Sequence, residues 1–321
     1  MTIQQFSYRF NIINRYKCLH FILEFAPPIC YILVMLKNKR IMLLTALTLA
    51  VCFALASCAM PGSGGETTFV SGEEYSDDVI PDDSDGTVRV TFPEGFTVSQ
   101  MAKRLEENGI CKADEFRSEA NKTEYLSEFG IEIGNPSERA FLLEGYLFPD
   151  TYDFYKGESV SSVIKKFLRN TMSRFTDEYK QRAAQLGYSM DEILNLAAII
   201  QQESGGSAEA PRVSSVIHNR LDSPDFRLLQ CDATVTYLKG SVKPYFDTDT
   251  YFNVYCENYN TYMCEGLPAG PINNPGLTSI KAALYPENTD YYYFLTDSAG
   301  VYHYSETYAE HQSKAVEAGL Q

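Results

Sequence analysis

The chain of 321 residues is long enough for two modest domains with hydrophobic cores. A hydrophobic fraction of 45% is typical of a globular protein, and a formal net charge of −15 argues against nucleic acid as a partner, since phosphates call for clustered Lys and Arg. The first 57 residues hold six basic residues and one acidic residue, so the negative charge lies in the remainder. This asymmetry indicates a targeting segment followed by a soluble domain.

The segment MLKNKRIMLLTALTLAVCFALASC, residues 35–58, has the parts of a secretory signal: a basic start and then an uncharged apolar run. It ends in LASC, which resembles the bacterial lipobox, so Cys58 is the predicted lipid-attachment site. The alternative is an uncleaved membrane helix, for which the run is at the short limit. Residues 1–34 are predicted to be an over-extended start, or alternatively a first membrane segment. Either anchor tethers the domain to the outer face of a membrane.

Residues 59–86 are predicted to be an acidic, disordered linker. From Gly62 to Gly86 the sequence holds eight acidic residues, no basic residue and many Gly and Ser. Such a segment repels itself and buries little apolar surface, so we expect it to act as a stalk.

Residues 87–140 are predicted to form a small strand/helix subdomain. TVRVTFPEG, from Thr87, alternates apolar and polar residues like a strand and closes in a turn. Thr97 can cap the following helix, which stops at Gly109, and residues 113–130 read as one further helix. This opening resembles the LysM-like unit that accompanies many cell-wall enzymes.

Residues 141–321 are predicted to form a second, mixed α/β domain, which gives an α+β fold class for the chain. FLLEGYLFPDTYDF, residues 141–154, is expected to fold as strands and a tight turn. Two helices follow, over residues 159–171 and 174–186, and then a helix that begins near Glu192.

The helix in EILNLAAIIQQESGG directs a carboxylate toward the protein interior. Leu196, Ile200 and Glu203 share one face, and the glycines after Ser204 end the helix. Apolar neighbours and the negative end of the helix dipole both disfavour the charged form of Glu203, so we expect a raised pKa. A carboxyl group that holds its proton near neutrality suits a general acid. The alternative is a structural Glu paired with Arg212 or Arg220.

Several motifs, in order, resemble the endolytic murein transglycosylase family, also called MltG or YceG-like. They are FPEG, LEGYLFPDTYDF, LAAIIQQES, RVSSVIHNRL, LQCDATVTY, YNTYMCEGLPAGPINNPGLTSIKAALYP and YYYFLTDSAGVYHYSETYAEH, and they cover residues 88–311. This chain differs from the family pattern in three places. Gln201 stands where members often have Glu, Cys231 and Ala233 replace a usual Ser and Pro, and the anchor is lipid instead of the usual helix.

The resemblance implies a lytic transglycosylase, a lyase that cuts the β-1,4 bond between N-acetylmuramic acid and N-acetylglucosamine and leaves a 1,6-anhydro end. Glu203 would be the lone catalytic acid, with no cofactor and no metal. The partners implied are nascent peptidoglycan glycan strands and peptidoglycan synthases. The enzyme would act at the outer face of a bacterial cell membrane.

Polar residues near Glu203 in the sequence suit sugar binding. Gln230, Asp232 and Thr234 alternate, so in a strand they would project from one face, although Asp232 can equally cap a helix. Further candidates for substrate binding are Asn219, Asn260, Thr261 and Tyr262. Asn219 and Arg220 are candidates to orient Glu203, with the alternative that both lie on the polar face of the next helix.

The remaining cysteines and histidines are given no catalytic role. Cys256 and Cys264 could close a short disulfide loop, with free thiols for all four late cysteines as the equal alternative. His218, His303 and His311 show no metal-ligand spacing and are read as structural.

Other functions are not excluded. A muramidase would use Asp232 as a second carboxylate, since ordinary glycosidases need two. A non-enzymatic wall-binding lipoprotein would use only the LysM-like unit, and a solute-binding lipoprotein would fit the anchor alone.

Overall fold

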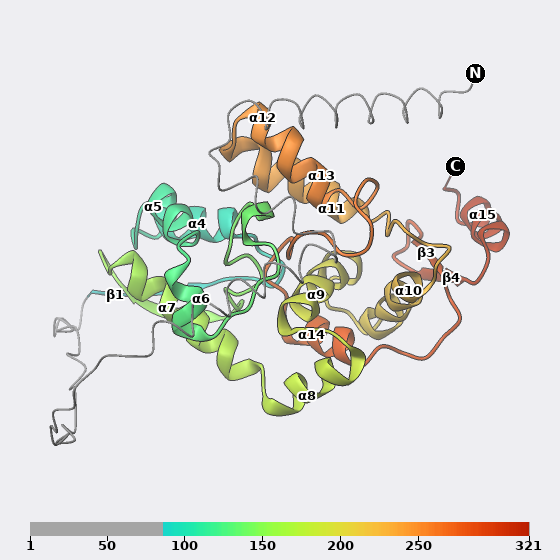
Figure 1. The fold of residues 1–321 in the computed structure, drawn as a ribbon, viewed down its shortest axis with the longest axis horizontal. Helices are drawn as coiled ribbons and strands as arrows, with labels where there is room; N and C mark the ends of the chain where they lie inside the picture. Colours follow the sequence, from blue (N-terminus) through green and yellow to red (C-terminus); the bar gives the residue numbers. More distant parts are fainter. Residues whose placement is uncertain (1–85, 321) are drawn as a thin grey trace, which may run out of the picture. The chain divides into compact units, whose positions relative to one another are not determined.

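The computed structural model describes residues 86–320 (Figure 1). The predicted start, signal, lipid site at Cys58 and acidic linker lie outside these residues. No helix between residues 86 and 320 combines the length and apolar character needed to span a bilayer.

The described part is mostly helical, with two small antiparallel sheets. Its longer elements, in chain order, are β1 (Thr87–Thr91), α4 (Val98–Glu107), α5 (Ala113–Glu119), α6 (Glu124–Phe129), β2 (Thr151–Tyr155), α7 (Val160–Arg174), α8 (Asp177–Leu186), α9 (Met190–Ser204), α10 (Ala210–Asp222), α11 (Asp232–Tyr237), α14 (Leu277–Leu284), β3 (Tyr293–Thr296), β4 (Tyr302–Ser305) and α15 (Tyr308–Glu317). Between α11 and α14 lie the π-helical turns η2 (Leu238–Val242) and η4 (Tyr251–Tyr255), with the short η3 (Lys243–Tyr245), α12 (Thr248–Thr250) and α13 (Cys256–Tyr259). Another short helix, η1 (Pro136–Glu138), precedes β2. The predicted mixture of helix and strand is confirmed.

The first sheet joins distant parts of the sequence. β1 pairs with β2 in antiparallel register, from Thr87 opposite Tyr155 to Thr91 opposite Thr151. The predicted subdomain boundary after residue 140 therefore separates two strands that pair with each other. Residues 86–320 all belong to one compact unit.

The helices that follow β1 begin and end for local reasons. Thr97 caps α4 in a capping box with Gln100, as its position before the apolar pattern predicts. The prediction of a single helix over residues 113–130 is wrong. The chain breaks after α5 and resumes at α6, which lets the Asn121 side chain accept a hydrogen bond from the Leu142 backbone N–H at 2.8 Å and face the carbonyl of Ala140.

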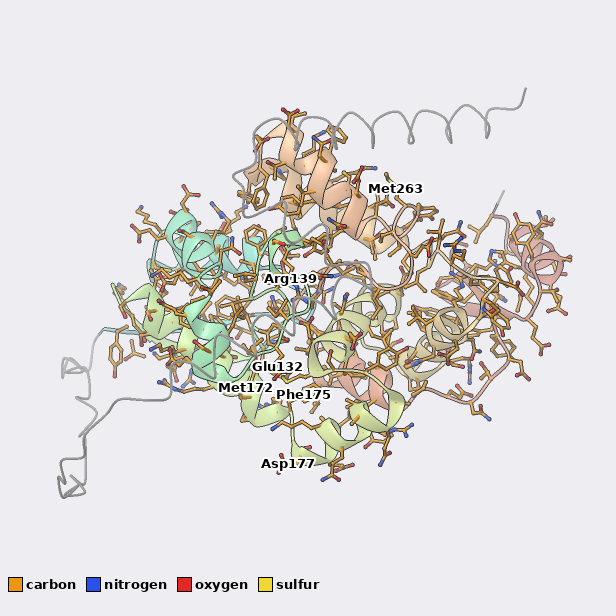
Figure 2. The ribbon with its side chains drawn as sticks, viewed as in Figure 1. Glu132, Arg139, Met172, Phe175, Asp177 and Met263 are labelled. Atoms are coloured by element: carbon orange, nitrogen blue, oxygen red, sulfur yellow. The ribbon has the colours of Figure 1, made fainter. Side chains whose placement is uncertain are left out.

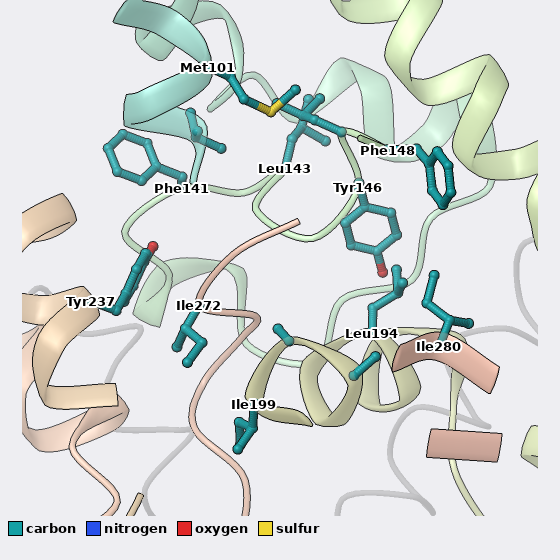
Figure 3. Packing of buried hydrophobic residues seen from close by; sticks show 14 of the residues in the cluster. Met101, Phe141, Leu143, Tyr146, Phe148, Leu194, Ile199, Tyr237, Ile272 and Ile280 are labelled. Carbon is teal, nitrogen blue, oxygen red and sulfur yellow. The ribbon is translucent and has the colours of Figure 1, made fainter. Parts of the chain in front are cut away.

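The core is built around α9. Most residues of α9 are buried, and α14 and α10 pack along it (Figure 1). Residues 141–150 form turns and loop, so the strands expected there reduce to β2. Figure 3 shows the Tyr146 ring directed from this turn toward α9, near Leu194, and its hydroxyl donates to Asp191 Oδ1 at 2.8 Å.

Gly145 in the LEGYLFPD motif is required by both conformation and space. Its φ of +88° lies in the left-handed region, and a Cβ there would lie 2.5 Å from Pro271 Cγ. We expect Gly145→Ala to lower the free energy of unfolding by about 2–4 kcal/mol, because backbone strain adds to overpacking. Gly157→Ala is the control, since Gly157 has φ +72° but open space around it, and should cost only about 1–2 kcal/mol. Urea denaturation measures both, and equal losses would contradict the packing argument.

A buried carboxyl group, Glu144, ties four segments together. It is fully buried and accepts hydrogen bonds from Val98 N at 2.9 Å, Asn274 Nδ2 at 3.1 Å and Tyr237 Oη at 3.2 Å. Burial raises the pKa of Glu144 to about 8, and the three hydrogen bonds act in the opposite direction. Glu144 is therefore neutral over most of the physiological pH range.

The raised pKa of Glu144 makes stability depend on pH. An unfolded Glu ionises near pH 4.3, whereas the folded one holds its proton to about pH 8, so its contribution is full below pH ~4.3 and is lost as pH rises toward 8. Gln has the same shape and no charge. We expect the stability of Glu144→Gln relative to wild type to increase steadily between pH 5 and pH 8, followed by denaturant unfolding. A constant difference over that range would contradict the assignment.

The cysteine alternatives are resolved within residues 86–320. Cys111, Cys231, Cys256 and Cys264 are all free thiols, so no disulfide closes the loop between the last two.

Candidate active site

Glu203 lies where the sequence places it, at the C-terminal end of α9. Ser189 and Glu192 form the capping box that begins the helix, and Gly205, in a left-handed conformation, ends it. Most of this helix is buried, and in its last turn Glu203 is partly exposed.

The surroundings of Glu203 favour its protonated form. Burial raises the pKa of the Glu203 carboxyl group, and the negative charge of Asp232 raises it further. The backbone N–H of Ala233 and the guanidinium of Arg220 act in the opposite direction, because both favour the charged carboxylate. The net direction is upward, which is the property that a general acid needs.

The structural alternative for Glu203 is not supported. Within the described residues, no Lys, Arg or His nitrogen lies within 4.0 Å of its carboxylate. Arg212 instead pairs with Glu209 at 3.3 Å and Glu287 at 3.0 Å. Arg220 donates to the backbone carbonyls of Tyr292 at 2.6 Å and Leu229 at 2.8 Å.

Asp232 lies close to Glu203 but not on a strand. Of the two alternatives for this segment, a strand and a helix that starts near Asp232, the structure has the helix, because Asp232 is the first residue of α11. Its side chain makes no capping hydrogen bond, and its Oδ1 accepts from the Tyr262 hydroxyl at 2.8 Å. Asp232 and Tyr262 are both exposed, so together they offer a carboxylate and an aromatic ring beside Glu203.

Thr234 and Thr261 are buried next to the candidate site and hold its backbone in place. Both are fully buried, and their hydroxyls lie 3.1 Å apart. Thr261 Oγ1 also accepts from the Cys231 backbone N–H at 2.9 Å. These contacts fix the start of α11 against the loop after α13, so in this structure the two threonines hold other residues in place and do not face solvent.

Gln230 has an unusual backbone conformation. Its φ of +54° is the one positive φ of a non-glycine residue among the described residues, and its N–H donates to the Thr261 carbonyl at 3.1 Å. Non-glycine residues in this region cost free energy and cluster at functional sites. Gln230 is exposed, and nearby Asn260 directs its Oδ1 at the Tyr262 N–H, at 3.0 Å.

Asn219 does not face Glu203. Its amide donates to the carbonyls of Thr289 at 2.7 Å and Tyr291 at 2.9 Å, which anchors the segment before β3. Asn219 and Arg220 thus both hold that segment against α10. The charge of Arg220 additionally acts to lower the pKa of Glu203.

Two contacts to α9 had no signal in the sequence. The Tyr302 hydroxyl of β4 donates to the Glu203 carbonyl at 2.8 Å. The Gln201 side-chain oxygen accepts from Gly276 N at 3.0 Å and from Ser279 Oγ at 2.8 Å. An amide is suited to that role, and Gln201 is buried, so it fixes α14 to the end of α9.

The loop of residues 265–276 packs on α9 over much of its length. The Asn195 amide donates to the Pro268 carbonyl at 2.6 Å, and the Asn273 amide donates to the Ala198 carbonyl at 2.7 Å. The residues between 86 and 320 hold no cluster of three or more His, Cys, Asp or Glu side chains suited to a metal ion. At this end of α9 the carboxyl group of Glu203 has a raised pKa.

Comparisons with known proteins agree with one another. The profile of the YceG-like family matches residues 70–317. An endolytic murein transglycosylase of Bacillus subtilis (strain 168) is 34% identical over 238 residues, which are 70% of this chain and 63% of the relative. One from Streptococcus pneumoniae (D39) is 24% identical over 71% of this chain and 44% of its own length.

A solved structure is also similar. The crystal structure of a yceG-like protein from Listeria monocytogenes aligns with a TM-score of 0.60 and 30% identity, over 70% of this chain and 75% of that chain. The match to each curated relative spans less than two thirds of that relative's length. On the family profile and the identity to the Bacillus protein, the chain belongs to the YceG-like family.

Proposed function

We propose that this chain is an endolytic peptidoglycan lytic transglycosylase. The observation that carries the proposal is Glu203, a half-buried carboxyl group with a raised pKa and no ion-pair partner among the described residues, at the end of the central helix. The names of the two curated relatives support the reaction class.

The proposed reaction uses one carboxyl group twice. Protonated Glu203 gives its proton to the glycosidic oxygen as the bond from C1 of N-acetylmuramic acid to that oxygen breaks. The Glu203 carboxylate then takes the proton of the C6 hydroxyl of the same sugar, and O6 bonds to C1 to close a 1,6-anhydro ring. No water is consumed, and Glu203 ends protonated for the next cycle.

In this proposal four residues would contact sugar rings or hold those that do. Gln230, Asp232 and Tyr262 are exposed, and Asn260 positions Tyr262 through its backbone N–H. Asp232 raises the pKa of Glu203, so its charge keeps the acid protonated as well.

The setting of the enzyme is part of the proposal. A lipid at Cys58 or a membrane helix would hold the enzyme at the outer face of a bacterial cell membrane, where synthases extend new strands. The strand and helices near residues 87–140 would act as a LysM-like glycan-binding unit.

A second candidate function is a muramidase-type hydrolase, favoured by the proximity of Asp232 to Glu203. Asp232→Asn distinguishes the two. In the lyase, this change removes a negative charge that raises the Glu203 pKa, so we expect the activity that requires protonated Glu203 to fall at lower pH than in wild type. A hydrolase that needs two carboxylates would instead lose activity at every pH. The measurement is kcat/KM against pH.

The test of the reaction itself is the mass of the new chain ends. The purified protein is incubated with uncrosslinked glycan strands, and the products are weighed by mass spectrometry. Ends lighter by one water than hydrolysed ends would establish the lyase, and reducing ends would establish a hydrolase. Glycan binding with no cleavage would leave a wall-binding module and refute the enzyme.

A further inference from the structure

The backbone carbonyl of Glu203 receives no hydrogen bond from the residues directly after it, 204–207. The last carbonyls of a helix lack donors within the helix and must find them elsewhere. The Gly206 N–H bonds the Ser204 hydroxyl at 3.3 Å, and the Ser207 N–H bonds the Ser204 carbonyl at 3.1 Å. Gly205 and Gly206 both have a positive φ, and glycine restrains the backbone less than any other residue. The position of the Glu203 backbone therefore depends on a contact from another part of the chain.

Tyr302 of β4 makes that contact. Its hydroxyl donates to the Glu203 carbonyl at 2.8 Å, from 99 positions later in the sequence. The Tyr302 ring stacks on the rings of Phe294 and Tyr304, with centroids 6.4 Å and 6.2 Å away. Because a Tyr side chain has only two χ angles and this one is held in a stack, its hydroxyl has little freedom to move.

The hairpin that carries Tyr302 is anchored on both sides. β3 and β4 lie between α10 and α15, and side chains fill the space between these elements (Figure 2). From α10, Arg220 Nε donates to the Tyr292 carbonyl at 2.6 Å. From α15, Lys314 Nζ donates to the Tyr304 carbonyl. The hairpin is therefore a fixed support for the Tyr302 hydroxyl.

We propose that Tyr302 is a positioning residue for Glu203, and that the β3–β4 hairpin fixes the last turn of α9 so that the Glu203 carboxyl group keeps one direction. This inference rests on the proposed function. A catalytic group works only within a narrow range of positions, and a displacement of about 1 Å can lower the rate roughly 100-fold. Since the Tyr302 hydroxyl bonds the backbone of Glu203, it acts through that residue and does not bind the substrate.

The test compares two Tyr→Phe substitutions on the same strand. Tyr302→Phe removes only the hydroxyl that bonds Glu203. Tyr304→Phe is the matched control, since its hydroxyl bonds Glu209 Oε2 at 2.9 Å. With uncrosslinked glycan strands we expect kcat of Tyr302→Phe to fall about tenfold, the order of one lost hydrogen bond, with KM changed less than about twofold. Tyr304→Phe should match the wild type in both constants.

Two further measurements separate positioning from other roles. Hydrogen exchange of the amides in the last turn of α9, followed by mass spectrometry, needs no cleavage. It should be faster in Tyr302→Phe than in the wild type and unchanged in Tyr304→Phe. Glycan affinity is compared between Glu203→Gln and the double variant Glu203→Gln, Tyr302→Phe, and the two should bind equally.

Several outcomes would overturn the positioning role. They are an equal loss of kcat in Tyr304→Phe, a raised KM in Tyr302→Phe alone, and weaker glycan binding by the double variant. A Tyr302→Phe protein that no longer folds, judged by its melting temperature, would make the hydroxyl a requirement of the fold and overturn the role as well. A wild type that cleaves no glycan, with faster exchange confined to Tyr302→Phe, would refute the proposed function and leave the hold of the hairpin on Glu203 in place.

Discussion

Glu203→Gln should abolish glycan-strand cleavage, with kcat falling by roughly 10²–10⁴-fold, the contribution typical of a general acid. Gln keeps the size of the side chain and can accept the Ala233 N–H contact, but it has no proton to give to the leaving oxygen and cannot take one from the C6 hydroxyl. The rate is measured from the release of anhydro ends in single-turnover mixtures, and glycan affinity is measured separately, because binding should survive.

Two further measurements, on a second variant and on the pH dependence of the wild type, test whether the effect comes from the acid function of Glu203. Glu203→Asp keeps the acid but shortens it by one methylene, so it should retain more activity than Gln. In the wild type, activity should fall as pH rises through the raised pKa of Glu203, since the protonated form is required. If the Glu203→Gln variant cleaved glycan as fast as the wild type, Glu203 would not be the general acid. It would then be a structural residue.

Arg139→Met should lower the free energy of unfolding by about 3–5 kcal/mol, the cost of leaving one member of a buried ion pair alone. The side chains of Arg139 and Asp191 are 1% and 10% exposed, and after the change the Asp191 carboxylate would keep only the Tyr146 hydroxyl. The loss also removes the donor to the Ala269 carbonyl, which holds the 265–276 loop. Denaturant unfolding followed by circular dichroism measures the change.

The same substitution at an exposed ion pair is the control. Arg89 pairs with Asp153 across β1 and β2 at 2.8 Å, but their side chains are 74% and 50% exposed. Water and salt screen such a pair, so Arg89→Met should leave the unfolding midpoint nearly unchanged. Equal losses at the two sites would show that burial is not what makes the Arg139 pair matter.

The helices could be predicted because their signals are local. Ser189, Glu192 and the glycine after Ser204 define α9, and the 3.6-residue period places Glu203 at its end in line with the core. The same local reasoning left two alternatives open at Asp232, because the alternation of Gln230, Asp232 and Thr234 fits a strand and an Asp can equally start a helix. Tertiary contacts between Thr234 and Thr261 decided the outcome, and a sequence period does not contain them.

The rest of the site depends on contacts between distant residues. Tyr302 reaches the Glu203 carbonyl across 99 positions of sequence, and Arg139 reaches Asp191 across 52. Neither pairing leaves a periodic trace, and a buried Arg is uncommon enough that composition alone predicts exposure. The motifs of the family indicated that these segments belong together but not which atoms meet.

Asn274 sets the order in which the chain can fold. Its amide and carbonyl groups bond Gly95, Phe96 and Leu147, partners 127 to 179 positions earlier in the sequence. During synthesis, the segment around Glu144 must therefore wait for more than a hundred residues before its polar groups are satisfied. Such long-range closure slows folding and prolongs the exposure of an unfinished core. A nascent chain cut short before residue 274 would emerge as a substrate for chaperones or proteases, with α9 already formed and nothing to lock it in place.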